Sequence, residues 1–283
     1  MTLTAGLIQM TSSDDPAVNL DMTRMYLQQA AAQGATLALT PEVTNCISTS
    51  SAHQNRVLQT EDEDITLAGL REEARALGIW VLIGSLALKT KDADGRFANR
   101  SFLIDPDGVI QARYDKIHMF DVQVSPSETY RESSGFRPGT SAVVAQTPLA
   151  SIGLSICYDL RFPHLYRALA KSGAVLLTVP AAFSPITGAA HWETLLRARA
   201  IETGCFVLAP AQTGRHPASD GQRARSTYGH SMVVAPWGEV LLDMGTAPGV
   251  GLVNLDLARV VEARDRVPSL FHDRDYTILD APR

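Results

Sequence analysis

The stretch LASIGLSICYDLRFP, residues 149–163, joins an apolar run to a cysteine and then to a polar segment. An apolar run of this length is typical of a buried strand, and the segment that begins near Phe162 has the spacing of a helix. Cys157 therefore stands where a buried strand ends and a helix follows. A thiol at such a junction is a candidate for chemistry as well as for packing.

The same alternation of apolar runs and amphipathic stretches extends over nearly the whole chain. Residues 19–34, 65–78 and 189–204 carry apolar positions at helical spacing, and each segment ends at a glycine. Short apolar runs between these segments predict strands. We therefore predict one α/β domain over residues 1–283, with many strands and flanking helices.

Three segments do not follow this alternation. Residues 118–140 and 213–228 are rich in polar residues, Gly and Pro, and we predict a long loop for each. The tail from Ala263 is charged, and we predict that it is irregular.

Three of the predicted strands end on a side chain that can take part in catalysis. TLALTPE ends on Glu42, VIQARYDK on Lys116 and LASIGLSIC on Cys157. In open α/β sheets, ligands bind beyond the carboxyl ends of the strands. A carboxylate, an ammonium and a thiol that meet there would form a nucleophilic site. Taken singly, each has an ordinary alternative role, as a helix cap, a solvent-facing charge or a core thiol.

The chemistry that suits such a site is attack on a carbonyl group. Cys157 would be the nucleophile, Glu42 would accept and return the proton, and Lys116 would stabilise the oxyanion. The backbone amide of Tyr158 is a second candidate donor to the oxyanion. We expect the helix near Phe162 to favour the thiolate. Beside the lysine and the thiol, Glu42 can hold or release a proton near neutral pH, provided that burial raises its pKa.

Composition and charge argue against several classes of protein. The net charge of −5 gives no reason to expect binding to nucleic acid or to an anionic membrane surface. We find no apolar run of about 18 residues and no evident signal peptide. Cys46, Cys157 and Cys205 form no CxxC pair, which predicts free thiols and a cytoplasmic location. With no glycine-rich phosphate loop and no zinc-binding spacing, we expect neither a cofactor nor a metal.

Several segments resemble the blocks of the nitrilase superfamily of carbon–nitrogen hydrolases, in the same order. They are LTPE (39–42), YDKIHMFDV (114–122), SICYDLRFP (155–163), PAAFSPITGAAHWETLLRARAIET (180–203) and YGHSMVVAPWGEV (228–240). The resemblance implies a four-layer α-β-β-α sandwich and a catalytic triad of Glu42, Lys116 and Cys157. It also implies a second glutamate, which matches Glu132 in YRESS, with Glu128 as the alternative.

The segment TGRH (213–216), followed by YGHSMVV and PWG, is similar to the deaminated glutathione amidases within this superfamily. Those enzymes hydrolyse an amide to 2-oxoglutarate and cysteinylglycine, and the resemblance implies the same reaction here through a cysteine thioester. One alternative is an ω-amidase that acts on 2-oxoglutaramate or another small amide. Another is a catalytically inactive binding protein on a hydrolase scaffold.

A 2-oxoglutaryl group carries a carboxylate, so its pocket needs a cation. Arg215 in TGRH is a candidate, with Arg161 as the alternative, because an arginine can hold a carboxylate through two parallel hydrogen bonds. Phe183 and Thr187, in the block PAAFSPITG, are further candidates for substrate contacts.

The resemblance also implies a homodimer or a higher homo-oligomer. The charged tail EARDRVPSLFHDRDY, residues 262–276, would then reach across to the partner subunit. Phe271 and Tyr276 in that tail are apolar and need a surface to cover them.

Overall fold

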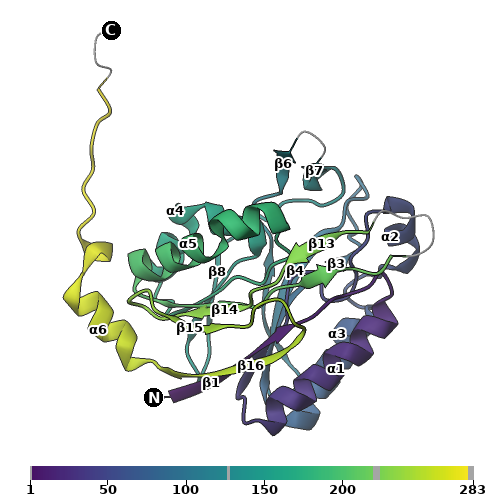
Figure 1. Ribbon diagram of the computed structural model, residues 1–283, viewed down its shortest axis with the longest axis horizontal. Coiled ribbons are helices and arrows are strands. Elements are labelled where there is room, and N and C mark those ends of the chain that lie inside the picture. Colours follow the sequence, from purple (N-terminus) through teal and green to yellow (C-terminus); the bar gives the residue numbers. More distant parts are fainter. Residues whose placement is uncertain (1, 126–127, 219–223, 280–283) are drawn as a thin grey trace.

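The computed structural model describes residues 2–125, 128–218 and 224–279, which form two six-stranded sheets stacked face to face (Figure 1). The first sheet has the strand order β16 (Gly249–Asp256), β1 (Thr2–Gln9), β2 (Leu37–Leu39), β3 (Trp80–Leu88), β4 (Ala98–Ile104) and β5 (Ile110–Asp115). The second has the order β15 (Val240–Asp243), β14 (Met232–Val234), β11 (Phe206–Ala209), β10 (Leu176–Thr178), β9 (Ser151–Leu154) and β8 (Val143–Gln146).

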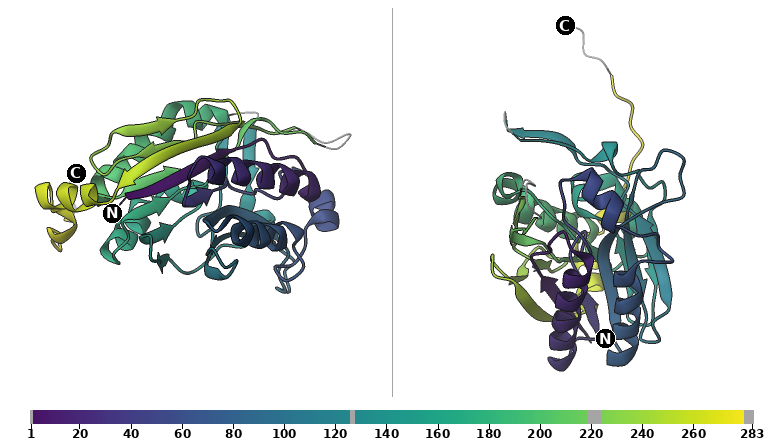
Figure 2. Two further views of the ribbon diagram at one scale, coloured as in Figure 1. Left: turned by 90° about the horizontal axis from the view of Figure 1, so that it is seen from below. Right: turned by 90° about the vertical axis from the view of Figure 1, so that its right-hand side faces the viewer.

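Helices cover the outer face of each sheet, as the views in Figure 2 show. The first sheet is covered by α1 (Pro16–Ala32) and α3 (Ile65–Leu77), and the second by α4 (Pro163–Lys171) and α5 (Pro185–Thr203). The layers follow in the order α-β-β-α, which confirms the predicted sandwich. Within the described part of the chain, no helix is long and apolar enough to cross a membrane.

The core explains why the central strands are mostly apolar. In β3, Leu82 packs between the two sheets, whereas Val81 and Ile83 pack against α1 and α3. Side chains alternate between the two faces of a strand, so a strand covered on both faces has few positions for a polar residue. All nine residues of β3 are buried for this reason.

The strands that lead to the predicted site residues run in compatible directions. In the first sheet, β2 is parallel to β3, and β5 is antiparallel to β4, which is itself antiparallel to β3. The carboxyl ends of β2 and β5 therefore lie at the same edge of this sheet. In the second sheet, β9 and β10 are parallel, and the chain leaves β9 towards Cys157.

The predictions for the irregular segments need correction. The two segments predicted as loops each contain a small hairpin, β6 (Asp121–Ser125) with β7 (Glu128–Arg131) and β12 (Thr213–Arg215) with β13 (Ser226–Tyr228). Short 3₁₀ turns lie at Glu132–Ser134 in the first of these segments and at Ser269–Phe271 in the tail. The tail is helical in α6 (Ala258–Arg266), and a short helix α2 (Ser51–Val57) was not predicted. Elements this short carry too few residues for a periodic pattern to stand out.

Candidate active site

Two carboxylates and one ammonium meet between the ends of β2 and β5. Lys116 Nζ donates to Glu42 Oε1 at 2.8 Å and to both carboxylate oxygens of Glu132 at 2.9 Å. Lys116 is 2% exposed and Glu42 is 4% exposed, so this ion cluster is nearly sealed from water. The pairing with two carboxylates means that the buried ammonium is never left uncompensated.

The turns that carry Glu42 and Cys157 hold strained backbone. Val43, directly after Glu42, has a φ of 47°, and Cys157 itself has a φ of 50°. Residues other than glycine rarely adopt this left-handed region, and such strain concentrates at functional sites. Hydrogen bonds fix both turns: Val43 N donates to Ser85 Oγ at 2.8 Å, and Cys157 N donates to the Pro180 carbonyl at 2.9 Å.

The Cys157 thiol lies within hydrogen-bonding reach of Glu42 and is 7% exposed. Burial is the largest cause that raises the pKa of this thiol well above its usual value, and the charge of Glu42 adds to it, while Lys116 acts in the opposite direction. The expectation that the following helix favours a thiolate was therefore wrong. The chain forms a 3₁₀ turn over Cys157–Arg161 before α4 begins, and burial outweighs any helix dipole.

The pKa of Glu42 also differs from the expectation. Burial raises it, but the charge of Lys116, hydrogen bonds from Lys116 and Cys157, and the charge of Arg225 together hold the pKa below its ordinary value. The condition of a raised pKa is therefore not met, because the adjacent cations and hydrogen bonds outweigh burial. At neutral pH the site thus pairs a protonated thiol with an ionised carboxylate, which is the arrangement that general-base activation requires.

Lys116 stays charged for a related reason. Its burial lowers its pKa, but the charges of Glu132 and Glu42 outweigh burial and raise the pKa well above the ordinary value. A permanently protonated ammonium can stabilise an oxyanion, and it cannot itself act as a base at neutral pH.

Two contacts of Glu42 were missed by reasoning from the sequence. Asn99, on β4, donates through Nδ2 to Glu42 Oε1 at 2.9 Å, and the amide of Ala182 donates to Glu42 Oε2 at 2.8 Å. Both hold the carboxylate towards the thiol. Neither contact carried a distinct signal in the sequence, because Asn99 is one of three consecutive polar residues in β4 and the other donor is a backbone amide.

A buried aspartate also joins the turn of Cys157 to the segment of Lys116. Asp159 accepts hydrogen bonds from the Ile156 amide at 2.9 Å, from Tyr114 Oη at 2.6 Å and from the His118 amide at 3.0 Å, and His118 Nδ1 lies 2.7 Å away. Since Asp159 is fully buried, it ties the ends of β5 and β9 together at a fixed distance.

The other expected residues lie at different distances from this cluster. Glu132 bonds Lys116 directly, whereas Glu128 begins β7 and its side chain lies outside the described part of the structure. Tyr158 follows the thiol and packs edge-on against Phe120, with 5.0 Å between ring centroids. Arg215 is exposed on β12.

The candidates for substrate contacts near α5 form a second group beside the thiol. Phe183, which is 5% exposed, follows Ala182 and packs on Trp192 at 4.8 Å between centroids. The guanidinium of Arg161 stacks over the Phe183 ring at 5.6 Å. Thr187 is half-buried in the first turn of α5.

Comparison with known proteins places this geometry in a family. Residues 4–265 match the carbon–nitrogen hydrolase family. The chain belongs to this family. Among relatives of this carbon–nitrogen hydrolase, the deaminated glutathione amidase of Yersinia enterocolitica is 38% identical over 270 residues, which cover 95% of this chain and 92% of that protein. The deaminated glutathione amidase of Homo sapiens is 38% identical over 272 residues, 95% of this chain and 81% of that protein.

Solved structures agree with this assignment. The crystal structure of C. elegans NitFhit matches the hydrolase with a TM-score of 0.87 at 36% identity, over 96% of this chain and 65% of that chain. A mutant amidase of Nesterenkonia sp. AN1 matches with a TM-score of 0.75 at 28% identity, over 94% of this chain and 98% of that chain. That structure shows Michael addition of acrylamide at the active-site cysteine of the amidase.

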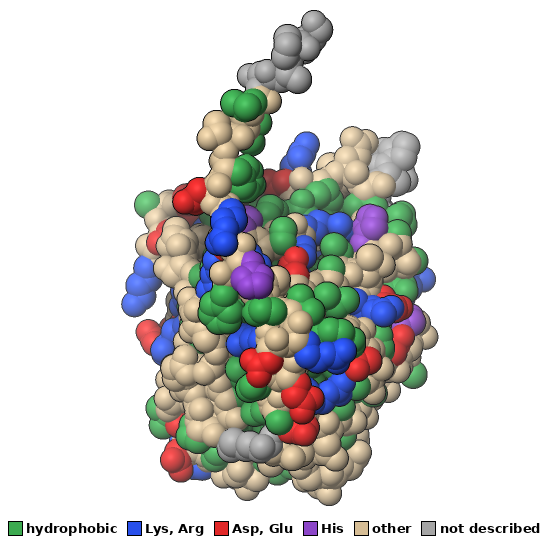
Figure 3. Space-filling view, turned by 90° about the vertical axis from the view of Figure 1, so that its left-hand side faces the viewer, with side chains coloured by type: hydrophobic (Ala, Val, Ile, Leu, Met, Phe, Trp, Pro, Cys, Tyr) green, Lys and Arg blue, Asp and Glu red, His purple; other side chains and the backbone are tan. Residues whose placement is uncertain are grey.

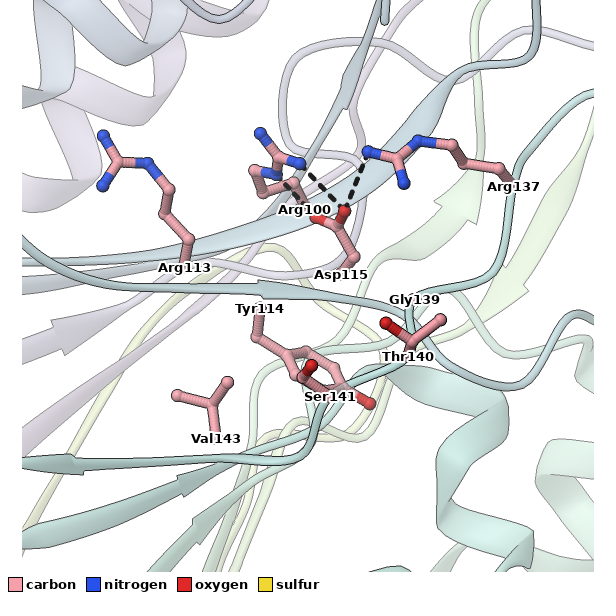
Figure 4. A pocket seen from close by; sticks show the side chains of 9 residues that line it. All are labelled: Arg100, Arg113, Tyr114, Asp115, Arg137, Gly139, Thr140, Ser141 and Val143. Carbon is pink, nitrogen blue, oxygen red and sulfur yellow. Dashed lines mark hydrogen bonds and ion pairs between the residues drawn. The ribbon is translucent and has the colours of Figure 1, made fainter. Parts of the chain in front are cut away.

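The hydrolase also has a surface pocket of about 250 Å³ between β5 and the segment 137–143 (Figure 4). Three arginines line it, but each is paired: Arg100 and Arg137 with Asp115, and Arg113 with Glu61. The pocket therefore offers little free charge, and neither Cys157 nor Lys116 lines it. Among the described residues, no group of three or more His, Cys, Asp or Glu side chains is placed to hold a metal ion.

Proposed function

We propose that the chain is an amidase that hydrolyses deaminated glutathione to 2-oxoglutarate and cysteinylglycine through a thioester on Cys157. The observation that carries this proposal is the contact between a protonated thiol and the ionised Glu42, beside the permanently charged Lys116. Amidase chemistry follows from the family, and the substrate follows from the names of relatives that match over 95% of the chain.

The proposed reaction begins with proton transfer from Cys157 to Glu42. The sulfur then attacks the amide carbonyl carbon, and the charge on the carbonyl oxygen is stabilised by Lys116 Nζ and the Tyr158 amide. Glu42 returns the proton to the nitrogen as the carbon–nitrogen bond breaks, which releases cysteinylglycine and leaves a thioester. Glu42 next takes a proton from water, which attacks the thioester carbon. As the carbon–sulfur bond breaks and 2-oxoglutarate leaves, Glu42 returns this proton to the sulfur and the thiol is regenerated.

In this scheme Glu132 is a positioning residue. It holds the ammonium of Lys116 through two hydrogen bonds and accepts a third, at 2.6 Å, from the amide of Phe120. The amide of Phe120 thus fixes the carboxylate, and the carboxylate fixes the lysine against the carbonyl oxygen of the substrate.

The test is turnover of a panel of amides by the purified enzyme, with products identified by mass spectrometry. We expect faster turnover of deaminated glutathione than of 2-oxoglutaramate. Preference for the smaller amide would make the enzyme an ω-amidase, because ammonia needs almost no room as a leaving group. Absence of turnover on every amide would favour a binding protein on a hydrolase scaffold.

We also propose that the chain is a single hydrolase domain that works as a homodimer or higher homo-oligomer in the cytoplasm. Asp273 pairs with Arg167 and Lys171 of α4, and beyond it the tail stands away from the body with apolar side chains along it (Figure 3). Tyr276 in this tail is 85% exposed. A partner subunit would cover such a segment. Three free cysteines are typical of a reducing compartment.

A further inference from the structure

Arg225, which directly precedes β13, lies beside the cluster around Cys157. Its Nη2 donates to the carbonyl of Ala182 at 2.6 Å, and the amide of the same alanine donates to Glu42 Oε2 at 2.8 Å. One residue therefore links the guanidinium to the carboxylate that serves the nucleophile. This contact fixes where the guanidinium stands relative to Cys157.

The guanidinium of Arg225 has unused donors. Its Nε is buried and has no hydrogen-bond partner within residues 2–125, 128–218 and 224–279. An arginine has five N–H donors, and buried donors are nearly always paired in a folded protein. The unpaired Nε is therefore a donor that is available to a bound molecule.

The charge of Arg225 is also uncompensated in the described part of the chain. The arginines of the surface pocket, Arg100, Arg113 and Arg137, each have a carboxylate partner, but no carboxylate whose side chain the structure describes forms an ion pair with Arg225. The guanidinium instead lies over the ring of Tyr130, 5.9 Å from its centroid. Its charge reaches the active site, since it contributes to the lowered pKa of Glu42.

We propose that Arg225 binds a carboxylate of the substrate and thereby determines the preference for acidic amides. Arginine matches a carboxylate through a planar fork of donors, and a partly buried guanidinium with an unpaired Nε beside the nucleophile is suited to that task. The inference rests on the proposed function, because deaminated glutathione carries one carboxylate on its 2-oxo acid and one on its glycine. Either carboxylate satisfies the same chemistry.

The other two arginines near the site are less suited to this role. Arg215 is the residue expected from the sequence, but it is exposed at the far end of β12, opposite Ser226. Arg161 is engaged with the Phe183 ring and with His191 Nδ1, which lies 3.3 Å from its Nη2. Arg225 differs from both in its direct hydrogen bond to the residue that holds Glu42.

The test compares substrates that differ only in charge. Deaminated glutathione is assayed beside two neutralised analogues, one with its 2-oxo acid carboxylate converted to a carboxamide and one with its glycine carboxylate converted in the same way. The measured quantity is the ratio of kcat/KM for the charged substrate to that for each analogue. Any effect of a substitution on folding or on Glu42 cancels in this ratio.

We expect Arg225→Gln to lower this ratio for one analogue by roughly 10-fold to 100-fold, as the loss of a hydrogen bond to a charged group would. The loss should fall mainly on KM, and the analogue concerned shows which carboxylate is bound. Arg225→Lys keeps the charge but loses the planar fork of donors, so its ratio should lie between those of the wild type and Arg225→Gln. Arg215→Gln removes the same charge from the same hairpin and is the matched comparison.

An unchanged ratio in Arg225→Gln for both analogues would overturn the inference. A ratio that falls in Arg215→Gln and not in Arg225→Gln would also overturn it. Failure of the wild-type enzyme on deaminated glutathione would refute the proposed substrate and not the role of Arg225. The same ratio is then measured on 2-oxoglutaramate and its neutral diamide. A wild-type enzyme that prefers the neutral member of every pair would also contradict the role of Arg225.

Discussion

Replacement of Lys116 by methionine should destabilise the protein in a way that depends on pH. Methionine has a similar length, so the change removes the charge and leaves most of the volume. In the wild type, Lys116 Nζ lies 2.8 Å from Glu42 and 2.9 Å from Glu132. In the variant, Glu42, which is 4% exposed, faces Glu132 with no cation between them. Removing one partner of a buried ion pair costs about 3–5 kcal/mol, because a buried charge is left unpaired.

The dependence on pH follows from the pKa of Glu42. In the wild type this pKa lies below the ordinary value of 4.5, so the carboxylate stabilises the fold above that pH and the contribution is lost on acidification. In Lys116→Met the opposing effect of burial dominates, and the pKa of Glu42 moves above its unfolded value. The destabilisation by the carboxylate then grows as the pH rises from the unfolded pKa to the folded one.

The measurement is the free energy of unfolding in urea at pH 5.5 and pH 8 for the wild type, Lys116→Met and Lys91→Met. Lys91 is exposed, and its replacement is the matched control for the loss of one charge. The difference in the free energy of unfolding between the wild type and Lys116→Met should be at least about 1.4 kcal/mol smaller at pH 5.5 than at pH 8. This amount corresponds to the binding of one proton over one pH unit. An equal difference at both pH values would refute this description of the buried cluster.

Three further predictions follow from the geometry. Gly84→Ala would place a Cβ 2.0 Å from the Thr40 carbonyl oxygen, beneath the turn of Glu42. This substitution should lower the stability measured by thermal unfolding by about 1–3 kcal/mol and slow turnover. A stable and fully active variant would contradict this prediction. The kcat/KM profile should be flat from about pH 6 to 8, because Glu42 is ionised and Cys157 protonated throughout; an ionisation near pH 7 would argue against this pair. Light scattering should show an oligomer, and deletion of residues 274–283 should weaken it; a monomer at all concentrations would exclude the predicted assembly.

The sequence was sufficient for the elements with strong patterns. Residues 65–78 alternate at helical spacing between a capping aspartate and Gly78, whose φ of 65° ends α3 as a glycine readily can. The apolar runs before Glu42, Lys116 and Cys157 indicated the strands and the edge at which they end. What the sequence pattern did not provide was the pairing of the two sheets, which the family resemblance supplied.

The parts that were missed depend on contacts between distant segments. Asn99 bonds Glu42 from another element, and Arg225 bonds Ala182, whose amide holds Glu42. The low pKa of Glu42 results from cations that lie far away in the sequence. The same holds for the thiol of Cys157, whose high pKa reflects burial that only the packed structure reveals. The local sequence pattern shows which residues are candidates for the site, whereas the charge states of these residues depend on neighbours that folding brings together.

The most direct test of the central claim is mass spectrometry of the enzyme quenched in acid during turnover of deaminated glutathione. A thioester on Cys157 should appear as one 2-oxoglutaryl group on the peptide that contains this residue, and Cys157→Ala should fold normally, form no adduct and show no turnover. An adduct on another residue would contradict the account. So would a Cys157→Ala enzyme that keeps about a tenth of wild-type activity, since loss of a covalent nucleophile costs far more than that.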